Sequence, residues 1–295
     1  MILSLLFFTF SFIFYVITAL LYIGHWVFKK RWLGQTATAL SYIALFSTSL
    51  ILIMRAAESG HAPFSNLYES MVLFVWAVNV GYLVIEYKHG IKIIGAFVMV
   101  IESLAMLSAA LLPYRFKSIE PLNPALQSKW HWMIDLLSTV GLEKYAIGWL
   151  DFHVFTTFIG YAAFAISFGL SIMYLIKNRA EEKGSANQII GALPDAATLD
   201  ELGYRAIAWG FPFLAVGIVT GAVWASYAWG TYWSWDPKET WSLITWFVYA
   251  AYLHARVTRG WRGKRCAYLS LLGFLGVIFL YWGVSFILPG LHAYA

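Results

Sequence analysis

The sequence contains the apolar run ILSLLFFTFSFIFYVITALLYIGH at residues 2–25, which has no aspartate, glutamate, lysine or arginine. A helix needs about 20 mostly apolar residues to cross the hydrocarbon core of a bilayer, and this run is long enough. It lacks a basic segment before it and a cleavage site of small residues after it. We therefore expect a retained membrane span and not a removed signal peptide.

Similar runs recur along the chain, in which 61% of the 295 residues are hydrophobic and 12% are charged. Soluble domains carry about 25% charged residues. The expected spans lie at about 2–25, 36–55, 67–86, 93–113, 152–176, 206–227, 241–257 and 267–288. Because backbone groups inside a bilayer must satisfy one another, these runs predict helices. We predict an all-α polytopic membrane bundle of about eight transmembrane helices, with residues 1–295 as a single integral membrane domain.

The basic residues predict the orientation, because cytoplasmic loops carry an excess of lysine and arginine. About 14 of the 20 fall in one set of connections, which includes the loop 177–205. That loop is expected to be cytoplasmic, and both termini, the loop 114–148 and residues 229–246 are expected on the outer side. The segment 125–140 of the outer loop has helical spacing and predicts an amphipathic helix on the membrane surface. The asymmetry accounts for the net charge of +5 and gives no reason to expect a nucleic-acid partner.

The chain has a single cysteine, Cys266, at the cytoplasmic mouth of the last expected span. It therefore holds neither a CxxC dithiol nor a CxxCH haem-attachment site. This excludes a thiol oxidoreductase and a c-type cytochrome.

The stretch WGTYWSWDPKETWSLITW at residues 229–246, called the tryptophan segment below, has five tryptophans around one aspartate, one lysine and one glutamate. One explanation is an aromatic belt, since tryptophan and tyrosine collect at membrane interfaces. A belt needs no fixed pattern and no carboxylates, however. A flat platform of indoles suits a large planar apolar ligand with polar groups at its edge, and we favour that interpretation.

Histidines indicate what such a ligand would be. Of the seven, His25 and His89 lie at cytoplasmic span ends, whereas His153 and His292 are expected at the level of the tryptophan segment. His254 follows Trp241 by 13 residues, about 20 Å deeper, and an ionisable residue at that depth is a functional candidate. Two imidazoles flanking an aromatic surface are what axial ligation of haem iron requires.

These motifs carry a family resemblance. WGxYWSWDPKETWSLxxW, preceded by LDELGYRAIAWGFPFL and followed by YAAYLHAR, resembles the tryptophan-rich WWD domain of the CcsA (ResC) family. That family is the haem-handling membrane subunit of the system II cytochrome c synthase. Further matching stretches are GHAPFSNLYES at 60–70, HVFTTFIGYAAFA at 153–165 and GLHAYA at 290–295. The resemblance implies an eight-helix membrane bundle, in agreement with the apolar runs.

The resemblance also implies roles for individual residues. His153 and His292 would hold haem iron beside the tryptophan segment, and His254 would bind haem on its way across the membrane. In the family, PALQSKW (residues 124–130) is expected close before the first external histidine, yet about twenty residues intervene here. This departure leaves His131 as a rival to His153.

The function implied is that of a holocytochrome c synthase, a thioether-forming lyase. The chain would export non-covalent haem b and present it on Trp229, Trp233, Trp235 and Trp241, with iron between His153 and His292. The apocytochrome's CxxCH thiols would then add to the haem vinyl groups. In this reading Trp233, Trp235 and Asp236 belong to the catalytic site. Asp236 would orient the haem propionates or pair with Lys238.

The resemblance implies partners and a location as well. Activity would need a CcsB/ResB-type membrane subunit, which supplies the second ligand at His254. Apocytochromes c would be substrates, and thiol-reducing proteins would act indirectly. The expected location is the bacterial cytoplasmic (inner) membrane with the haem site facing the periplasm, ahead of the plastid thylakoid membrane.

Two other functions fit the same residues less well. A haem exporter or chaperone would bind haem at the tryptophan segment and pass it to another protein for attachment. A di-haem electron carrier would need imidazole pairs on shared transmembrane helices at both membrane levels. The first is the main alternative, and the single clear transmembrane histidine disfavours the second.

Arg55, Glu58, His61 and Glu69 gather at the outer end of the second and third expected spans. They either neutralise haem propionates or form a solvated loop with a helix cap. The sequence leaves both interpretations open.

Overall fold

The computed structural model describes residues 2–64, 66–113, 117–118, 128–184, 187–288 and 290. These residues form helices and no strand, with one isolated β-bridge between Lys129 and Gly148. The helices are α1 (Ile2–Phe28), α2 (Arg31–Ser59), α3 (Leu67–His89), η1 (Lys92–Ile94), α4 (Gly95–Leu111), α6 (His131–Ser138), η3 (Glu143–Tyr145), α7 (Trp149–Glu182), α8 (Gln188–Gly191), α9 (Ala196–Trp229), α10 (Pro237–Thr258), α11 (Lys264–Ile278), the π-helical turn η4 (Phe279–Gly283) and α12 (Val284–Ile287).

Seven of the described helices are long and apolar enough to cross a membrane. They are α1, α2, α3, the segment Lys92–Leu111, α7, α9 and the segment Lys264–Ile287. The predicted all-α polytopic membrane bundle is therefore confirmed.

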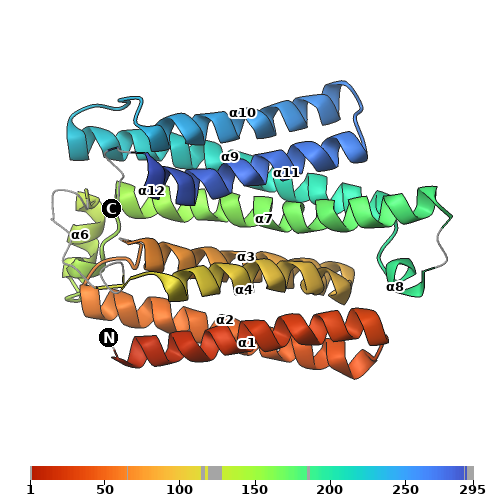
Figure 1. Cartoon of the computed structure of the whole chain (residues 1–295). Coiled ribbons are helices and arrows are strands. Elements are labelled where there is room, and N and C mark those ends of the chain that lie inside the picture. Colours follow the sequence, from red (N-terminus) through yellow and green to blue (C-terminus); the bar gives the residue numbers. More distant parts are fainter. Residues whose placement is uncertain are drawn as a thin grey trace.

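The predicted span 241–257 lies in α10, which is not among the seven. It runs alongside α9 and α11 in Figure 1, and its 22 residues reach about 33 Å. Tryptophans, tyrosines, His254 and Arg256 lower its hydropathy.

The helices α7 and α9 are longer than their apolar runs, with 34 residues each. α7 continues to Glu182 beyond the expected end at 176. α9 begins at Ala196 and not at 206, because the Asp195 side chain accepts a hydrogen bond from the Thr198 N–H at 2.6 Å and caps the helix. Amphipathic turns thus extend both helices beyond the apolar segments that mark the spans.

α7 lies in the middle of the bundle. It contacts α3, α4, α9 and α11, and Figure 1 shows α1–α4 on one side of it and α9–α11 on the other. The start of α1, helix α6, the tryptophan segment and α12 lie at one end, called the tryptophan end. The α1–α2 turn, α8 and the α10–α11 turn lie at the other end, called the basic end.

Small residues let α7 and α9 pack closely. A Cβ atom added at Gly210 would lie 2.8 Å from the Ala163 Cβ, and one at Gly160 would lie 3.1 Å from the Gly210 carbonyl oxygen. Close backbone approach through small residues is typical of helix pairs in membranes. It brings α9 against the start of α7, where the candidate ligand His153 lies.

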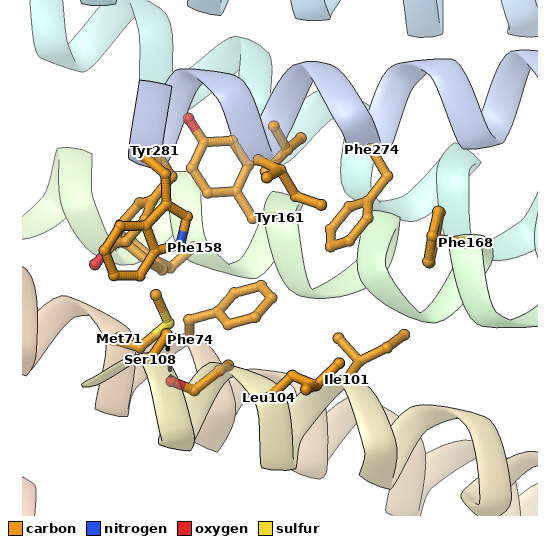
Figure 2. Close-up of a pocket in the computed structure, with 14 residues that line it drawn as sticks. Met71, Phe74, Ile101, Leu104, Ser108, Phe158, Tyr161, Phe168, Phe274 and Tyr281 are labelled. Atoms are coloured by element: carbon orange, nitrogen blue, oxygen red, sulfur yellow. Dashed lines mark hydrogen bonds between the residues drawn. The ribbon is translucent and has the colours of Figure 1, made fainter. Parts of the chain in front are cut away.

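An apolar cavity of about 340 Å³ lies between α3 and α4 on one side and α7 and α11 on the other (Figure 2). Met71 and Phe74 line it from α3, Phe158 and Tyr161 from α7, and Phe274 from α11. None of its lining residues is a histidine or carries a charge. The cavity therefore favours an apolar occupant and supplies no imidazole for a metal.

Candidate functional site at the tryptophan end

His153 lies in the second turn of α7 and is half-buried against α9. Its Nδ1 is 2.6 Å from the Gly217 carbonyl oxygen. Because a carbonyl oxygen only accepts, Nδ1 donates the proton in this hydrogen bond, and a neutral ring in this arrangement has its lone pair on Nε2. Metal-binding histidines are commonly oriented by donating the other ring N–H to a carbonyl. His153 thus has the tautomer that an Nε2 iron ligand requires.

Two glycines of α9 make room for this ring. A Cβ added at Gly221 would lie 2.6 Å from the His153 Nδ1, and one at Gly217 would lie 3.2 Å from the Thr157 Cα. Any side chain at Gly221 would push the imidazole away from the Gly217 carbonyl. The packing of α7 on α9 therefore sets the orientation of His153.

The tryptophan segment begins where α9 ends. Gly230 caps α9 with φ +78°, and Trp235 has φ +59° shortly before α10 starts. A left-handed backbone costs a residue with a side chain roughly 1–2 kcal/mol. Such strained residues cluster at binding and active sites, where the surrounding structure holds them in place. Trp235 is 68% exposed and is presented outward by this turn.

The indole rings pack edge to face. Trp224 and Trp229 lie 4.9 Å apart at 73°, and Trp233 and Trp235 lie 5.8 Å apart at 90°. Trp241 packs 4.3 Å from Phe279 of the π-helical turn η4. The expected flat platform is thus not one coplanar surface, because edge-to-face packing is the favoured geometry of paired aromatic rings.

Two carboxylates hold the backbone of this segment. The Glu239 Oε2 accepts hydrogen bonds from the Ser234 N–H at 2.8 Å and the Asp236 N–H at 3.1 Å, and the Asp236 side chain accepts one from the Lys238 N–H at 3.1 Å. Together with Pro237 they make a capping box at the start of α10. Asp236 therefore has a clear structural role, and its contact with haem propionates stays a prediction.

Gly290 lies beside the start of α10. A Cβ added at Gly290 would lie 2.5 Å from the Asp236 Oδ1 and 3.0 Å from the Pro237 Cδ. His292 lies outside the described residues, two positions after Gly290 in the sequence. Its role beside the tryptophan segment stays a prediction, and the contact of Gly290 with Asp236 supports it.

His254 lies far from this site. It is exposed on α10, about 20 Å along the helix from Trp241. Two residues later Arg256 is buried, paired with Asp200 at 2.5 Å and Glu201 at 3.2 Å. The structure therefore places the start of α7, with His153, at the same end of the bundle as the tryptophan segment (Figure 1), and it leaves the His254 side chain exposed on α10 towards the basic end.

His131 begins α6 and is exposed. The preceding Trp130 stacks on Trp132 at 6.0 Å and meets Trp149 at 5.6 Å and Phe152 at 5.9 Å. These rings anchor α6 to the start of α7. His131 thus lies at the tryptophan end, but on α6 and not on the α7 face that meets α9.

The residues at the α2–α3 turn are mostly buried. Arg55 and Glu69 have no exposed side-chain surface and pair at 2.7 Å. His61 is 5% exposed, with Nδ1 2.8 Å from the Ala62 carbonyl oxygen. Asn66 caps α3 by accepting a hydrogen bond from the Glu69 N–H at 2.8 Å. Of the four residues that the sequence places at this turn, only Glu58 is exposed, and it lies in the last turn of α2.

Comparisons with known proteins find relatives that match nearly the whole chain. The family model described as cytochrome C assembly protein matches residues 140–292. The chain is 39% identical to the cytochrome c biogenesis protein CcsA of Guillardia theta, over 92% of this chain and 91% of that protein. It is 36% identical to the CcsA of Gloeobacter violaceus, over 95% of this chain and 92% of that protein.

A solved structure shares the fold. The cytochrome c heme lyase CcmF superposes with a TM-score of 0.60 at 18% sequence identity, over 96% of this chain. This chain spans about half of the CcmF chain, 50% of its length. At this identity the likeness concerns the fold alone. The relatives at 36–39% identity, matched over nearly their whole length, decide the family: this chain belongs to the CcsA family of cytochrome c biogenesis proteins.

Proposed function

We propose that this chain is the haem-handling subunit of a cytochrome c synthase. It would carry haem b, as substrate, across the membrane and present it at the tryptophan end for attachment to CxxCH segments. Membership in the CcsA family gives the chain a role in cytochrome c maturation. The observation that supports the finer assignment best is His153, whose Nδ1–H donates to the Gly217 carbonyl at the same end of the bundle as the tryptophan segment (Figure 1).

Thioether formation requires the protein to position haem and the CxxCH segment, and it depends less on reactive side chains of the protein. Each cysteine thiol adds across a haem vinyl group, so that one S–H bond and one C=C double bond give a C–S and a C–H bond with no net change in electrons. The protein therefore has to hold the vinyl groups towards the incoming CxxCH segment. His153 would fix the iron with His292 on its other side, and the indoles would contact the porphyrin.

The rigid backbone of the tryptophan segment supports this role. Glu239 fixes both Ser234 and Asp236, so the loop that carries Trp233 and Trp235 is held at two points. A preorganised surface loses little freedom when a ligand binds. Trp235 would contact haem or the apocytochrome, because its ring is mostly exposed.

His254 would bind haem earlier, towards the basic end. Its imidazole lies on the outside of α10, where a second subunit can approach it. We propose that a CcsB/ResB-type subunit supplies the other axial ligand there. In this scheme the chain lies in a bacterial cytoplasmic membrane with the tryptophan end outside.

The direct test is the haem content of the purified chain with its partner subunit. We expect a b-type absorption spectrum and a pyridine haemochrome with both vinyl groups intact, followed by covalent transfer to a CxxCH reporter. Haem-free protein from haem-replete cells would contradict the proposal. Haem that binds and is never attached to the reporter would favour the exporter or chaperone.

A substitution at Gly221 tests the orientation of His153. Gly221→Val forces the imidazole from the Gly217 carbonyl, and we expect haem affinity to fall about 10–100-fold, the usual cost of losing a partner that orients a metal ligand. Haem titration followed by absorption measures it. Gly191→Val is the control, because a Cβ there meets nothing within 4 Å. Equal affinities in both variants would refute this role of the α7–α9 contact.

Replacement of His254 separates export from attachment. In sealed vesicles, His254→Ala should lower attachment of haem supplied at the basic end and leave attachment of haem supplied at the tryptophan end unchanged. His153→Ala should block both. A loss in His254→Ala that does not depend on the side of haem supply would contradict an export role.

A further inference from the structure

Three glutamates on the α1–α4 side of the bundle are buried, and their surroundings differ. Glu69 pairs with Arg55 at 2.7 Å, and Glu86 pairs with Lys92 at 2.6 Å. Glu102 is fully buried, and neither of its carboxyl oxygens has a hydrogen-bond partner among the described residues. Two of these carboxyls are thus neutralised by a cation, and the third is not.

Glu102 lies in the middle of the segment Lys92–Leu111 and faces α1. A Cβ added at Gly95 would lie 2.7 Å from the Tyr22 ring. Because α1 and α4 run in opposite directions (Figure 1), Glu102, two turns after Gly95, is level with Tyr15, two turns before Tyr22. The Tyr15 phenol is close enough to Glu102 to interact with its charge. The carboxyl is therefore deep in the bilayer and beside a phenol, with no cation opposite it.

Polar groups of α1 lead from this position towards the basic end. Thr18 lies one turn after Tyr15, and its buried Oγ1 also has no hydrogen-bond partner among the described residues. One turn further, the Tyr22 hydroxyl donates to the Glu86 Oε2 at 2.7 Å. Glu86 pairs with Lys92, whose side chain is 28% exposed. A hydrogen bond and an ion pair thus connect Tyr22 through Glu86 to the partly exposed Lys92, and Thr18 lies between the levels of Glu102 and Tyr22 along α1.

An ionised carboxylate without a partner is too costly in an apolar interior, so such a group takes up a proton. We propose that Glu102 is a proton-binding site in the middle of the membrane. It holds a proton at neutral pH and exchanges it with the basic end along Thr18 and Tyr22. This site is separate from the candidate haem site and does not depend on it.

No other charge near Glu102 provides an alternative partner in the described structure. Tyr15 is the titratable side chain that faces it from α1. α3 brings Tyr82 and Glu86 near the level of Tyr22, about 10 Å away along the helix axis. α7 meets α4 where Gly169 contacts Phe97, Val98 and Ile101, all uncharged. The state of Glu102 is therefore set by its burial and by Tyr15.

Infrared spectroscopy of the full chain in lipid nanodiscs tests the site. At neutral pH we expect a carboxylic acid C=O band that is lost in Glu102→Gln and shifted in Glu102→Asp. Glu86→Gln is the matched control and should keep the band, because Glu86 is ionised beside Lys92. In D₂O the band should move to lower wavenumber, and Thr18→Val should slow that change.

Several results would overturn the proposal. One is a neutral-pH difference spectrum between wild type and Glu102→Gln that lacks a carboxylic acid band. Loss of the carboxylic acid band on adding sodium would indicate that Glu102 binds a cation and not a proton. A band that never shifts in D₂O would mean that the proton does not exchange.

Glu102→Gln should melt at the wild-type temperature, since an amide resembles a neutral acid in shape and charge. If that variant does not fold, the shifted band of Glu102→Asp decides.

Discussion

His153→Gly, combined with the partner subunit and a CxxCH reporter, reduces covalent haem attachment to background, and added imidazole restores part of it. The substitution removes the ring whose Nδ1–H is held by the Gly217 carbonyl and leaves a space of the same shape against Gly221. Free imidazole can enter that space and donate to the same carbonyl. The yield of haem-stained reporter, measured with and without imidazole, reports the effect.

His131→Gly is the matched control. Both histidines lie at the tryptophan end, but His131 is exposed on α6, away from the contact between α7 and α9. The control should keep the wild-type yield. Loss of attachment in His131→Gly with normal attachment in His153→Gly would transfer the ligand role to His131, the rival that the position of PALQSKW suggested.

A second readout separates ligation from folding. If His153 binds iron through Nε2, the b-type spectrum of His153→Gly changes its Soret and α-band positions, and imidazole reverses the change. A structural role would alter stability and leave the spectrum of bound haem unchanged. The same pair of measurements applied to His292→Gly tests the second ligand, whose position the described structure does not include.

The fold was largely predictable because the length of each apolar run along the sequence is enough to indicate a membrane-spanning helix. Apolar runs of about twenty residues mark α1–α4, α7, α9 and α11, since the bilayer sets the length that a helix must have. The bounds of α7 and α9 could not be predicted from the apolar runs, because amphipathic turns continue a helix where the apolar run has ended. The helix α10 was expected as the span 241–257, although its aromatic and polar residues keep it outside the seven most apolar of the described helices.

Which face a residue occupies was harder to predict. A helix that is apolar all round, as α4 nearly is, shows no amphipathic period, so the burial of Glu102 does not follow from the pattern. The exposure of His254 depends on which face of α10 packs against α9 and α11. Gly217 and Gly221 escaped notice because a glycine in such a helix gives no local signal of what packs against it. Their spacing of four residues, on one helix face, was the available hint.

The tryptophan segment shows what a motif can and cannot tell. Its composition indicated a binding surface, and Asp236-Pro237 followed by Glu239 is a recognisable helix start. The edge-to-face angles of the indoles and the left-handed backbone of Trp235 depend on tertiary packing. A sequence pattern does not encode those directly.

The largest stability effect is expected at the buried ion pair near the α2–α3 turn. Glu69→Gln leaves the Arg55 guanidinium buried without its counter-charge, which costs about 3–5 kcal/mol of unfolding free energy in pairs of this kind. Arg55 also lies 5.0 Å above the Tyr68 ring and donates from Nη2 to the Lys117 carbonyl at 2.9 Å. These contacts hold the guanidinium in place, so it cannot escape to water when Glu69 is replaced.

A second pair with the same separation provides the control for Glu69→Gln. Lys264 and Glu182 also pair at 2.7 Å, but both side chains are about half exposed, at 48% and 52%. Glu182→Gln should barely change the unfolding midpoint, because solvent screens exposed pairs and hydrates the remaining charge. Unfolding in detergent with increasing denaturant compares the two variants. Equal shifts would show that burial does not determine the strength of these pairs.

Replacing both members of the buried pair should recover most of the loss. In Arg55→Met with Glu69→Leu no charge is left buried, and apolar side chains of similar volume often substitute for a buried ion pair without net cost. If the double variant is as unstable as Glu69→Gln, the pair contributes through the Lys117 and Tyr68 contacts and not through charge. If it is as stable as wild type but impaired in haem attachment, the charges serve the tryptophan end, as the position of Arg55 and Glu69 at the α2–α3 turn suggested.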